Sequence, residues 1–241
     1  MADTVDKKYT EKYYDRLAYG FKSTARLDHR RILELVDFED KRVLDIGCGL
    51  GTLLKLIPSS VKNKSGIESN AFAVESCKKD GLNVIEHNDL EKLPFRQESF
   101  DVVIMNEVIE HLRNPEKVVK EVQRIIRSGG VLVLTTPNKT LLVRNTDPTH
   151  CSEMNFSELE NLIRNGGFKI TAHEVCGFGP YSFIGRKILF PLGRMLLRTS
   201  GNKASNQING ARNAVDSSRL FRFRTSNIWS ADQQLIIATK S

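Results

Sequence analysis

The chain has 241 residues, of which 40% are hydrophobic and 27% are charged, and its formal net charge is +7. This length and hydrophobic content suit one domain with its own core. No apolar run approaches the roughly 20 residues that a membrane-spanning helix needs, and the first residues show no signal-peptide pattern. The four cysteines form no CxxC pair, so we expect reduced thiols in a cytoplasmic protein.

From residue 41 the chain alternates between short apolar runs and segments of helical periodicity. Strands are expected over 42–47, 64–68, 82–87, 100–106, 131–136, 168–175 and 233–240. Helices are expected over 52–57 and 70–81, from Asn114-Pro115 to Gly129-Gly130, and after a capping box of Ser157 with Glu160. Such alternation predicts a mostly parallel, doubly wound sheet with helices on both faces.

The domain organisation follows from the same order. Residues 1–40 have a helical tendency and are expected to form a cap over the ligand end of the sheet. Residues 41–176 form an α/β core, 177–230 a basic insert or lid, and 231–241 the last strand. Because no clean helix separates the last two strands, we expect them to pair as an interrupted hairpin.

The stretch "VLDIGCGLGTL", residues 43–53, places Gly47, Gly49 and Gly51 directly after the first strand. In open α/β sheets this turn is the usual place for a ligand, because glycine lets the ligand approach the backbone. The spacing GxGxG is one residue shorter than the dinucleotide fingerprint. Asp45 would also repel a pyrophosphate, and it suits a cation or a hydrogen-bond donor instead.

Two further acids follow the next two strands, Glu68 and Asp89. An acid at the end of the second strand typically holds ribose hydroxyls. Three acids at successive strand ends therefore predict a ligand with a ribose, an amine-bearing base and a cationic part. S-adenosylmethionine has all three.

Five ordered motifs carry a family resemblance: "VLDIGCGLGTL", "GIE", "NDLEKLPF", "FDVVIMNEVIEHLRNPEKVVKEVQRIIRSGGVLVLTTPN" and "FSELENLIRNGGF". Together they resemble a class I S-adenosylmethionine-dependent methyltransferase over roughly residues 40–175, and in particular the ubiquinone-biosynthesis O-methyltransferases. The resemblance implies a Rossmann-like seven-stranded sheet with an antiparallel last strand. It also implies cofactor contacts from Asp45, Gly47, Cys48, Gly49, Glu68, Asp89, Leu90 and Asn106, with Glu68 at the ribose, Asp89 at the adenine amine and Asn106 near the sulfonium.

After the fourth strand, "NEVIEHL" places Glu107, Glu110 and His111 at i, i+3 and i+4, on one face if the segment is helical. Two carboxylates and an imidazole could ligate Mg²⁺ or Mn²⁺. The resemblance extends to small-RNA 2′-O-methyltransferases, in which such a motif is associated with metal-assisted methylation of a hydroxyl. The alternative is a structural role in the pocket wall.

A loop after the fifth strand brings His150 towards the expected site. A hydroxyl acceptor benefits from a base, so His150 and His111 are the candidate catalytic residues. The alternative for His150 is a loop histidine paired with Asp147. His29, His87 and His173 are expected to be structural.

Residues 177–230 hold nine Lys or Arg and a single acid, Asp216, so this segment accounts for the positive charge of the chain. Within it, 181–203 combines basic and apolar residues. A lid over the acceptor pocket, contact with an anionic membrane or a lipid-linked substrate, and, less favoured, nucleic-acid binding all remain open.

The sequence thus predicts an S-adenosylmethionine-dependent methyltransferase acting on a hydroxyl of a small-molecule, lipid-linked or glycan substrate. The alternatives are a metal-assisted RNA 2′-O-methyltransferase and a protein that binds the cofactor without transfer. We expect a cytoplasmic protein, in contact with a membrane if the basic segment binds lipid. The acceptor itself has no motif in the chain.

Overall fold

The computed structural model describes residues 27–61, 63–139, 149–176 and 233–241. Seven strands form one sheet in the order β3-β2-β1-β4-β5-β7-β6. Their bounds are β1 Val43–Ile46, β2 Lys64–Glu68, β3 Val84–Glu86, β4 Phe100–Asn106, β5 Ile126–Pro137, β6 Phe168–Cys176 and β7 Gln233–Lys240. The helices are α3 Leu27–Leu35, α4 Thr52–Leu56, α5 Ala71–Lys79, the short 3-10 turn η1 Ile109–His111, α6 Pro115–Ile125 and α7 Phe156–Asn165.

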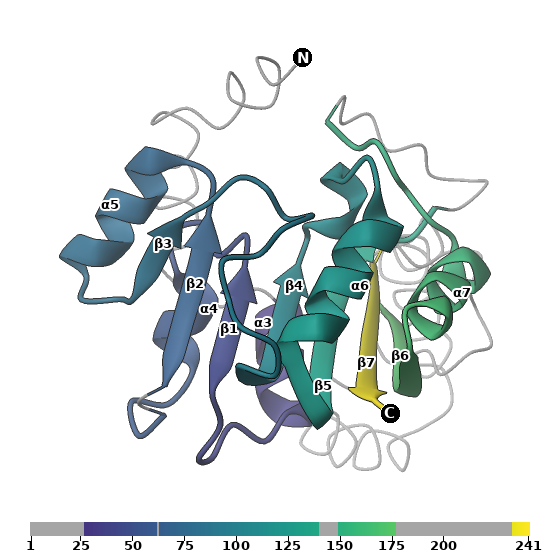
Figure 1. Cartoon of the computed structure of the whole chain (residues 1–241), viewed down its shortest axis with the longest axis horizontal. Helices are drawn as coiled ribbons and strands as arrows, with labels where there is room; N and C mark the ends of the chain where they lie inside the picture. The colour runs from purple at the N-terminus through teal and green to yellow at the C-terminus, as the bar shows by residue number, and fades with distance from the viewer. Residues whose placement is uncertain (1–26, 62, 140–148, 177–232) are drawn as a thin grey trace, which may run out of the picture.

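The sheet reverses its strand order between β1 and β4, and its last strand runs against the others. Strands β1 to β5 pair in parallel, whereas β7 pairs antiparallel with both β5 and β6. Figure 1 shows β7 as the yellow arrow between β5 and β6, pointing opposite to β4. The predicted Rossmann-like, seven-stranded α/β fold with an antiparallel last strand is confirmed.

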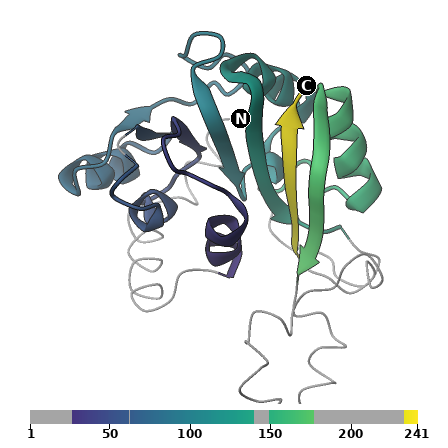
Figure 2. The same cartoon turned by 90° about the horizontal axis from the view of Figure 1, so that it is seen from below.

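Helices cover both faces of the sheet because alternate strand residues point to opposite sides. On β4, Val103 and Met105 belong to the core under α6 and α7, whereas Val102 and Ile104 belong to the core under α3, α4 and α5. Figure 2 shows α3 and α7 on opposite sides of the sheet. Because both faces of β4 are covered, its sequence is a nearly continuous apolar run.

The described part of the expected N-terminal cap is α3 with residues 36–40. Ile32 is fully buried and Val36 is nearly so, and both join the core on one sheet face. Arg31 forms a two-point ion pair with Glu174 of β6, at 2.7 Å from Nε and 2.5 Å from Nη2. Helix α3 therefore packs on one sheet face, and Arg31 ties it to the carboxyl end of β6. Residues 1–26 lie outside the described part.

Two predicted element boundaries are wrong. The helix that begins at Pro115 ends at Ile125, and Gly129-Gly130 lie inside β5. Gly129 has φ +70°, and the register shifts from Phe100↔Ile126 to Val102↔Val131, so the glycines shape a bulge in the strand.

The second error concerns the capping box, which uses Asn155 and Glu158 instead of Ser157 and Glu160. Both pairs fit the same sequence pattern. The extended backbone of Asn155 (φ −77°, ψ 174°) makes it the N-cap residue, and α7 begins at Phe156.

Candidate active site

The glycine-rich loop follows β1 at the carboxyl edge of the sheet. Gly47, Gly49 and Gly51 all have positive φ, between +53° and +69°, where a side chain is strained. A Cβ on Gly47 would lie 2.6 Å from a methyl carbon of Val108, and one on Gly51 would overlap Leu82. Local packing therefore requires glycine at these two positions independently of any ligand.

Glu68, the last residue of β2, fixes the geometry of this loop. Its Oε2 accepts a hydrogen bond from the backbone N–H of Gly49 at 2.9 Å. Its Oε1 accepts bonds from the backbone N–H groups of Ser69 and Asn70 at 2.9 and 3.0 Å. The side chain is only 8% exposed. Glu68 thus ties the end of β2 to the loop after β1.

Asp45 lies one residue before the end of β1 and is 2% exposed. Burial raises the pKa of its carboxyl group to about 8, and the nearby Glu68 carboxylate adds to this rise. Among the described residues, no group donates a hydrogen bond to Asp45. A buried carboxylate with a raised pKa is a candidate for binding a cation or donor.

The loop after β3 carries Asp89 and Leu90. Asp89 is exposed, and Leu90 packs against the core under α6. His87 Nε2 lies 2.7 Å from the carbonyl oxygen of Asp89 and 3.0 Å from that of Lys92. Since both partners can only accept, Nε2 carries the proton. The expected structural role of His87 is therefore to hold this loop in place.

Asn106 ends β4, and polar groups from two other elements orient its side chain. The hydroxyl of Thr135 donates to Asn106 Oδ1 at 2.7 Å, and Asn106 Nδ2 donates to His29 Nε2 at 3.3 Å. His29 comes from α3 and is 6% exposed. The sequence analysis missed this histidine as a site residue. No local pattern could have found it, because 77 positions separate it from Asn106.

Glu107 does not share a helical face with Glu110 and His111, contrary to expectation. Its φ is +58°, so the chain turns sharply before the short helix η1 begins. Its backbone N–H donates to the carbonyl of Thr135 at 3.1 Å, and its Oε2 accepts from Gln233 Nε2 at 3.2 Å. Glu107 therefore faces β5 and β7.

A different trio comes together at this edge: Glu110, His111 and His150. One ligand-type atom from each lies within 4.8 Å of those of the other two. The two imidazole rings are also 4.8 Å apart between centroids and nearly perpendicular. Glu110 is 1% exposed, and its Oε2 accepts a bond from the Thr136 hydroxyl at 3.0 Å. His150 thus takes the place that the sequence analysis gave to Glu107.

Backbone hydrogen bonds bring the loop of His150 to η1. The N–H groups of Cys151 and Ser152 donate to the carbonyl of Glu110 at 2.7 and 2.9 Å. The Ser152 hydroxyl donates to the carbonyl of Leu112 at 2.6 Å. These bonds hold the loop against η1, so the position of His150 does not depend on its own side chain.

The two histidines are oriented through Nδ1. His111 Nδ1 lies 3.2 Å from the carbonyl oxygen of Thr149, and His150 Nδ1 lies 2.9 Å from Glu153 Oε1. Since each partner accepts, Nδ1 carries the proton and Nε2 the lone pair in the neutral ring. The partner of His150 in the described residues is Glu153, whereas Asp147 lies outside them.

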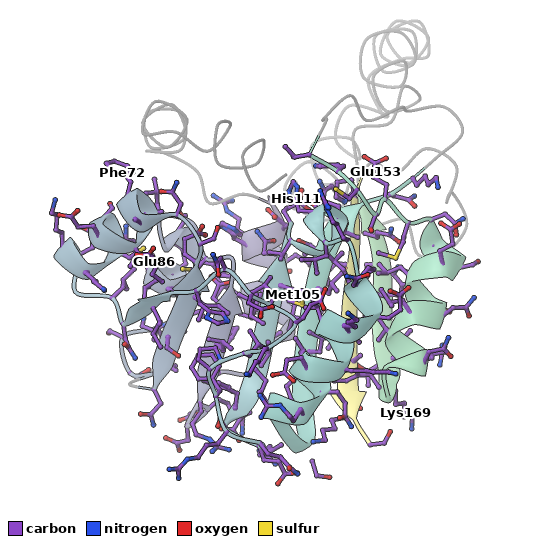
Figure 3. The ribbon with its side chains drawn as sticks, turned by 45° about the horizontal axis from the view of Figure 1, so that its top comes forward. Phe72, Glu86, Met105, His111, Glu153 and Lys169 are labelled. Carbon is purple, nitrogen blue, oxygen red and sulfur yellow. The ribbon has the colours of Figure 1, made fainter. Side chains whose placement is uncertain are left out.

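This donor set fits a divalent cation. Histidines that bind a metal commonly donate their other ring N–H to a carbonyl or carboxylate, as both rings do here. Two imidazoles and one carboxylate suit Mn²⁺ better than Mg²⁺, which prefers oxygen ligands. Figure 3 shows His111 and Glu153 at the same edge of the ribbon, with Lys169 at the opposite end.

Comparison with known proteins agrees with this fold. The family model described as a methyltransferase domain matches residues 17–173. A relative from Mycolicibacterium smegmatis, named as a probable S-adenosylmethionine-dependent methyltransferase, is 34% identical over 53% of this chain and 52% of its own length. A ubiquinone biosynthesis O-methyltransferase from Maricaulis maris is 25% identical over 69% of this chain and 74% of its own.

Among solved structures, a S-adenosylmethionine-dependent methyltransferase from Archaeoglobus fulgidus superposes with a TM-score of 0.66 at 22% identity, over 95% of this chain and all of that one. The chain spans about half the length of the first curated relatives that it matches.

The fold and the family match define the class. This chain belongs to the methyltransferase domain family, among the class I S-adenosylmethionine-dependent methyltransferases. Within the described residues, no helix is both long enough and apolar enough to cross a membrane.

Proposed function

We propose that the chain transfers the methyl group of S-adenosylmethionine to a hydroxyl group of a small-molecule, lipid-linked or glycan acceptor. The observation that carries this proposal is the trio Glu110, His111 and His150 at the carboxyl edge, after β4 and β5. A hydroxyl is a poor nucleophile unless a base or a cation acts on its proton. One of the two histidines could act as the base, or the trio could bind the cation.

The cofactor would lie along the carboxyl ends of β1, β2 and β3. The cationic methionine part suits the buried Asp45, beside Gly47, Cys48 and Gly49. Among the described residues, Glu68 Oε2 accepts a hydrogen bond from Gly49 alone, so it retains a lone pair for a ribose hydroxyl. Asp89 and Leu90 would border the adenine.

Asn106 would lie near the sulfonium. Its side chain is fixed by Thr135 and His29, so it would be positioned before the cofactor binds. Methyl transfer is an in-line displacement in which the sulfonium is the leaving group. The protein therefore contributes mainly by holding acceptor and donor in line and by excluding water.

His150 is the proposed base. Its Nδ1 donates to Glu153, and a carboxylate in that position stabilises the imidazolium that forms when Nε2 takes the hydroxyl proton. His111 would orient the same hydroxyl.

If a cation takes part, Glu110, His111 and His150 would hold Mn²⁺ or Mg²⁺, and the cation would act on the hydroxyl proton in place of His150. A bound cation lowers the pKa of a coordinated hydroxyl. The same arrangement would serve an RNA 2′-hydroxyl, which keeps RNA as the second candidate acceptor. Contact of 181–203 with an anionic membrane also stays a prediction, because that segment lies outside the described residues.

The experiment incubates the purified chain with methyl-labelled cofactor and separate acceptor pools: phenols, polyprenyl-linked phenols, glycans, amines and short RNA. Each pool is assayed with Mn²⁺ and after exhaustive chelation. Transfer to one hydroxyl pool supports the proposal, and transfer to RNA alone selects the second candidate. Labelling of amines alone contradicts both. Cofactor binding by calorimetry without transfer to any pool would indicate a binding protein.

A further inference from the structure

Two buried thiols meet at the glycine-rich loop. Cys48 belongs to the loop, and Cys77 lies on α5. Both side chains are buried, with exposures of 9% and 0%. Cys77 Sγ donates to the carbonyl oxygen of Gly49 at 3.3 Å, and Cys48 Sγ lies 3.9 Å from that same oxygen. Residues 29 positions apart in the chain thus converge on one carbonyl.

Their convergence on the Gly49 carbonyl makes the two thiols unequal. The interaction between the two side chains lowers the pKa of Cys77 and raises the pKa of Cys48. Burial raises the pKa of both, and Lys55 acts against this at Cys77. Cys77 is therefore the thiol that ionises more readily, and the thiolate is the reactive form.

Neighbouring glycines leave room for the sulfur atoms. A Cβ on Gly66 of β2 would lie 2.7 Å from Cys48 Sγ, and one on Gly51 would lie 3.1 Å from Cys77 Sγ. Glycine at these two positions therefore leaves the space that the two sulfur atoms occupy. Both cysteines are free thiols in this structure.

We propose that Cys48 and Cys77 are an oxidisable pair whose disulfide closes the cofactor loop. The Cys77 thiolate attacks a peroxide oxygen, which breaks the O–O bond and leaves a sulfenic acid and one water after proton transfer. The Cys48 thiol then attacks the sulfenic sulfur, forms the S–S bond and releases a second water. Two thiols lose two electrons in total, and hydrogen peroxide gains them.

The disulfide would disturb the cofactor loop in two ways. An S–S bond of about 2.05 Å is far shorter than any contact between two thiols, so the Cys48 side chain must move towards α5. The S–H donor to the Gly49 carbonyl also disappears. Because Gly49 is the residue that Glu68 holds through its N–H, movement here displaces the ribose side of the proposed site. Cofactor affinity should fall.

The test uses the full chain, oxidised with hydrogen peroxide and then alkylated. Peptide mapping should yield a linked Cys48–Cys77 peptide, about 2 Da lighter than the two reduced peptides together. Alkylation of the exposed Cys151 should decrease in the same samples, which shows that the oxidant dose was sufficient. S-adenosylmethionine affinity, measured by calorimetry, should fall at least about tenfold and recover with dithiothreitol.

Cys77→Ala and Cys77→Ser are the matched variants, and either one that retains cofactor binding should keep its affinity after peroxide. Mapping of the wild-type chain needs no variant and no methyl transfer, so its result is independent of the proposed acceptor. Absence of the linked peptide while Cys151 is oxidised would overturn the proposal. So would a linked chain that binds the cofactor with unchanged affinity.

Discussion

Glu68 Oε2 lies 2.9 Å from the backbone nitrogen of Gly49, which joins the second strand to the loop after the first. The acid that the resemblance assigns to the ribose is therefore also a structural support of the cofactor loop. A mutation at Glu68 should affect both properties, and the two effects can be measured separately.

Glu68→Ala removes the acceptor for three backbone N–H groups in a largely buried place. We expect the free energy of unfolding to fall by about 1–3 kcal/mol and S-adenosylmethionine affinity to fall at least about tenfold. Urea unfolding and calorimetry measure the two effects. Glu75→Ala on α5, at a side chain that is 67% exposed, is the matched control. Wild-type affinity in a folded Glu68→Ala chain would remove Glu68 from the ribose.

Asp45→Asn should stabilise the ligand-free chain, and more so at high pH. Burial raises the pKa of Asp45 to about 8, whereas an unfolded Asp titrates near about 3.9. Between these values the folded state holds a proton that the unfolded state releases, so this group's contribution to the free energy of unfolding decreases as the pH rises and levels off above about pH 8.

The melting temperature of Asp45→Asn should therefore exceed that of the wild type by more at about pH 8.5 than at about pH 5. Scanning calorimetry of the ligand-free proteins measures this difference. Asp37→Asn, at an exposed position, should show no such trend. An equal gap at both pH values would contradict a raised pKa at Asp45.

Glu110→Gln should decrease methyl transfer at least about tenfold and raise the Mn²⁺ concentration needed for half-maximal rate. The amide oxygen can still accept from the Thr136 hydroxyl, which holds Glu110 at 3.0 Å, so the fold should survive. Initial rates across a Mn²⁺ titration measure the effect. Glu116→Gln, exposed in the first turn of α6, is the control. A rate and Mn²⁺ dependence equal to wild type would exclude Glu110 from the chemistry.

Asn155→Ala should lower the free energy of unfolding by about 1 kcal/mol, because it removes the N-cap of α7. Ser157→Ala, at an exposed position, should stay within about 0.5 kcal/mol of the wild type. Urea unfolding of the two variants decides between the two capping boxes that the sequence allows. A larger loss for Ser157→Ala would restore the sequence-based assignment.

Local patterns predicted the elements well. The run Phe100–Asn106 coincides with β4, and Asn114-Pro115 does open α6. The mostly parallel sheet followed from chain alternation, and the antiparallel last strand followed from the resemblance. One error arose because two overlapping sequence patterns both fit a capping box. The other arose because Gly129-Gly130 form a β-bulge and do not end the helix.

The site was predictable only in part, for a physical reason. Glu68 and Asn106 end their strands, and strand ends meet at one edge of a parallel sheet. The contacts of His29 with Asn106 and of His150 with Glu110 depend on how α3 and a loop dock. Residue spacing also could not predict the sharp turn at Glu107, because an argument from i, i+3 and i+4 positions assumes a continuous helix.

Strand β6 ends at Cys176 and β7 begins at Gln233, and these two residues are paired neighbours in the sheet. The sheet therefore holds the two ends of residues 177–232 next to each other, and Gln233 donates a hydrogen bond to Glu107. Because Cys176 and Gln233 are already neighbours, the pairing of β6 with β7 does not restrict the length or sequence of the chain between them. The pairing of β6 with β7 should therefore survive replacement of residues 177–232 by a segment of another length.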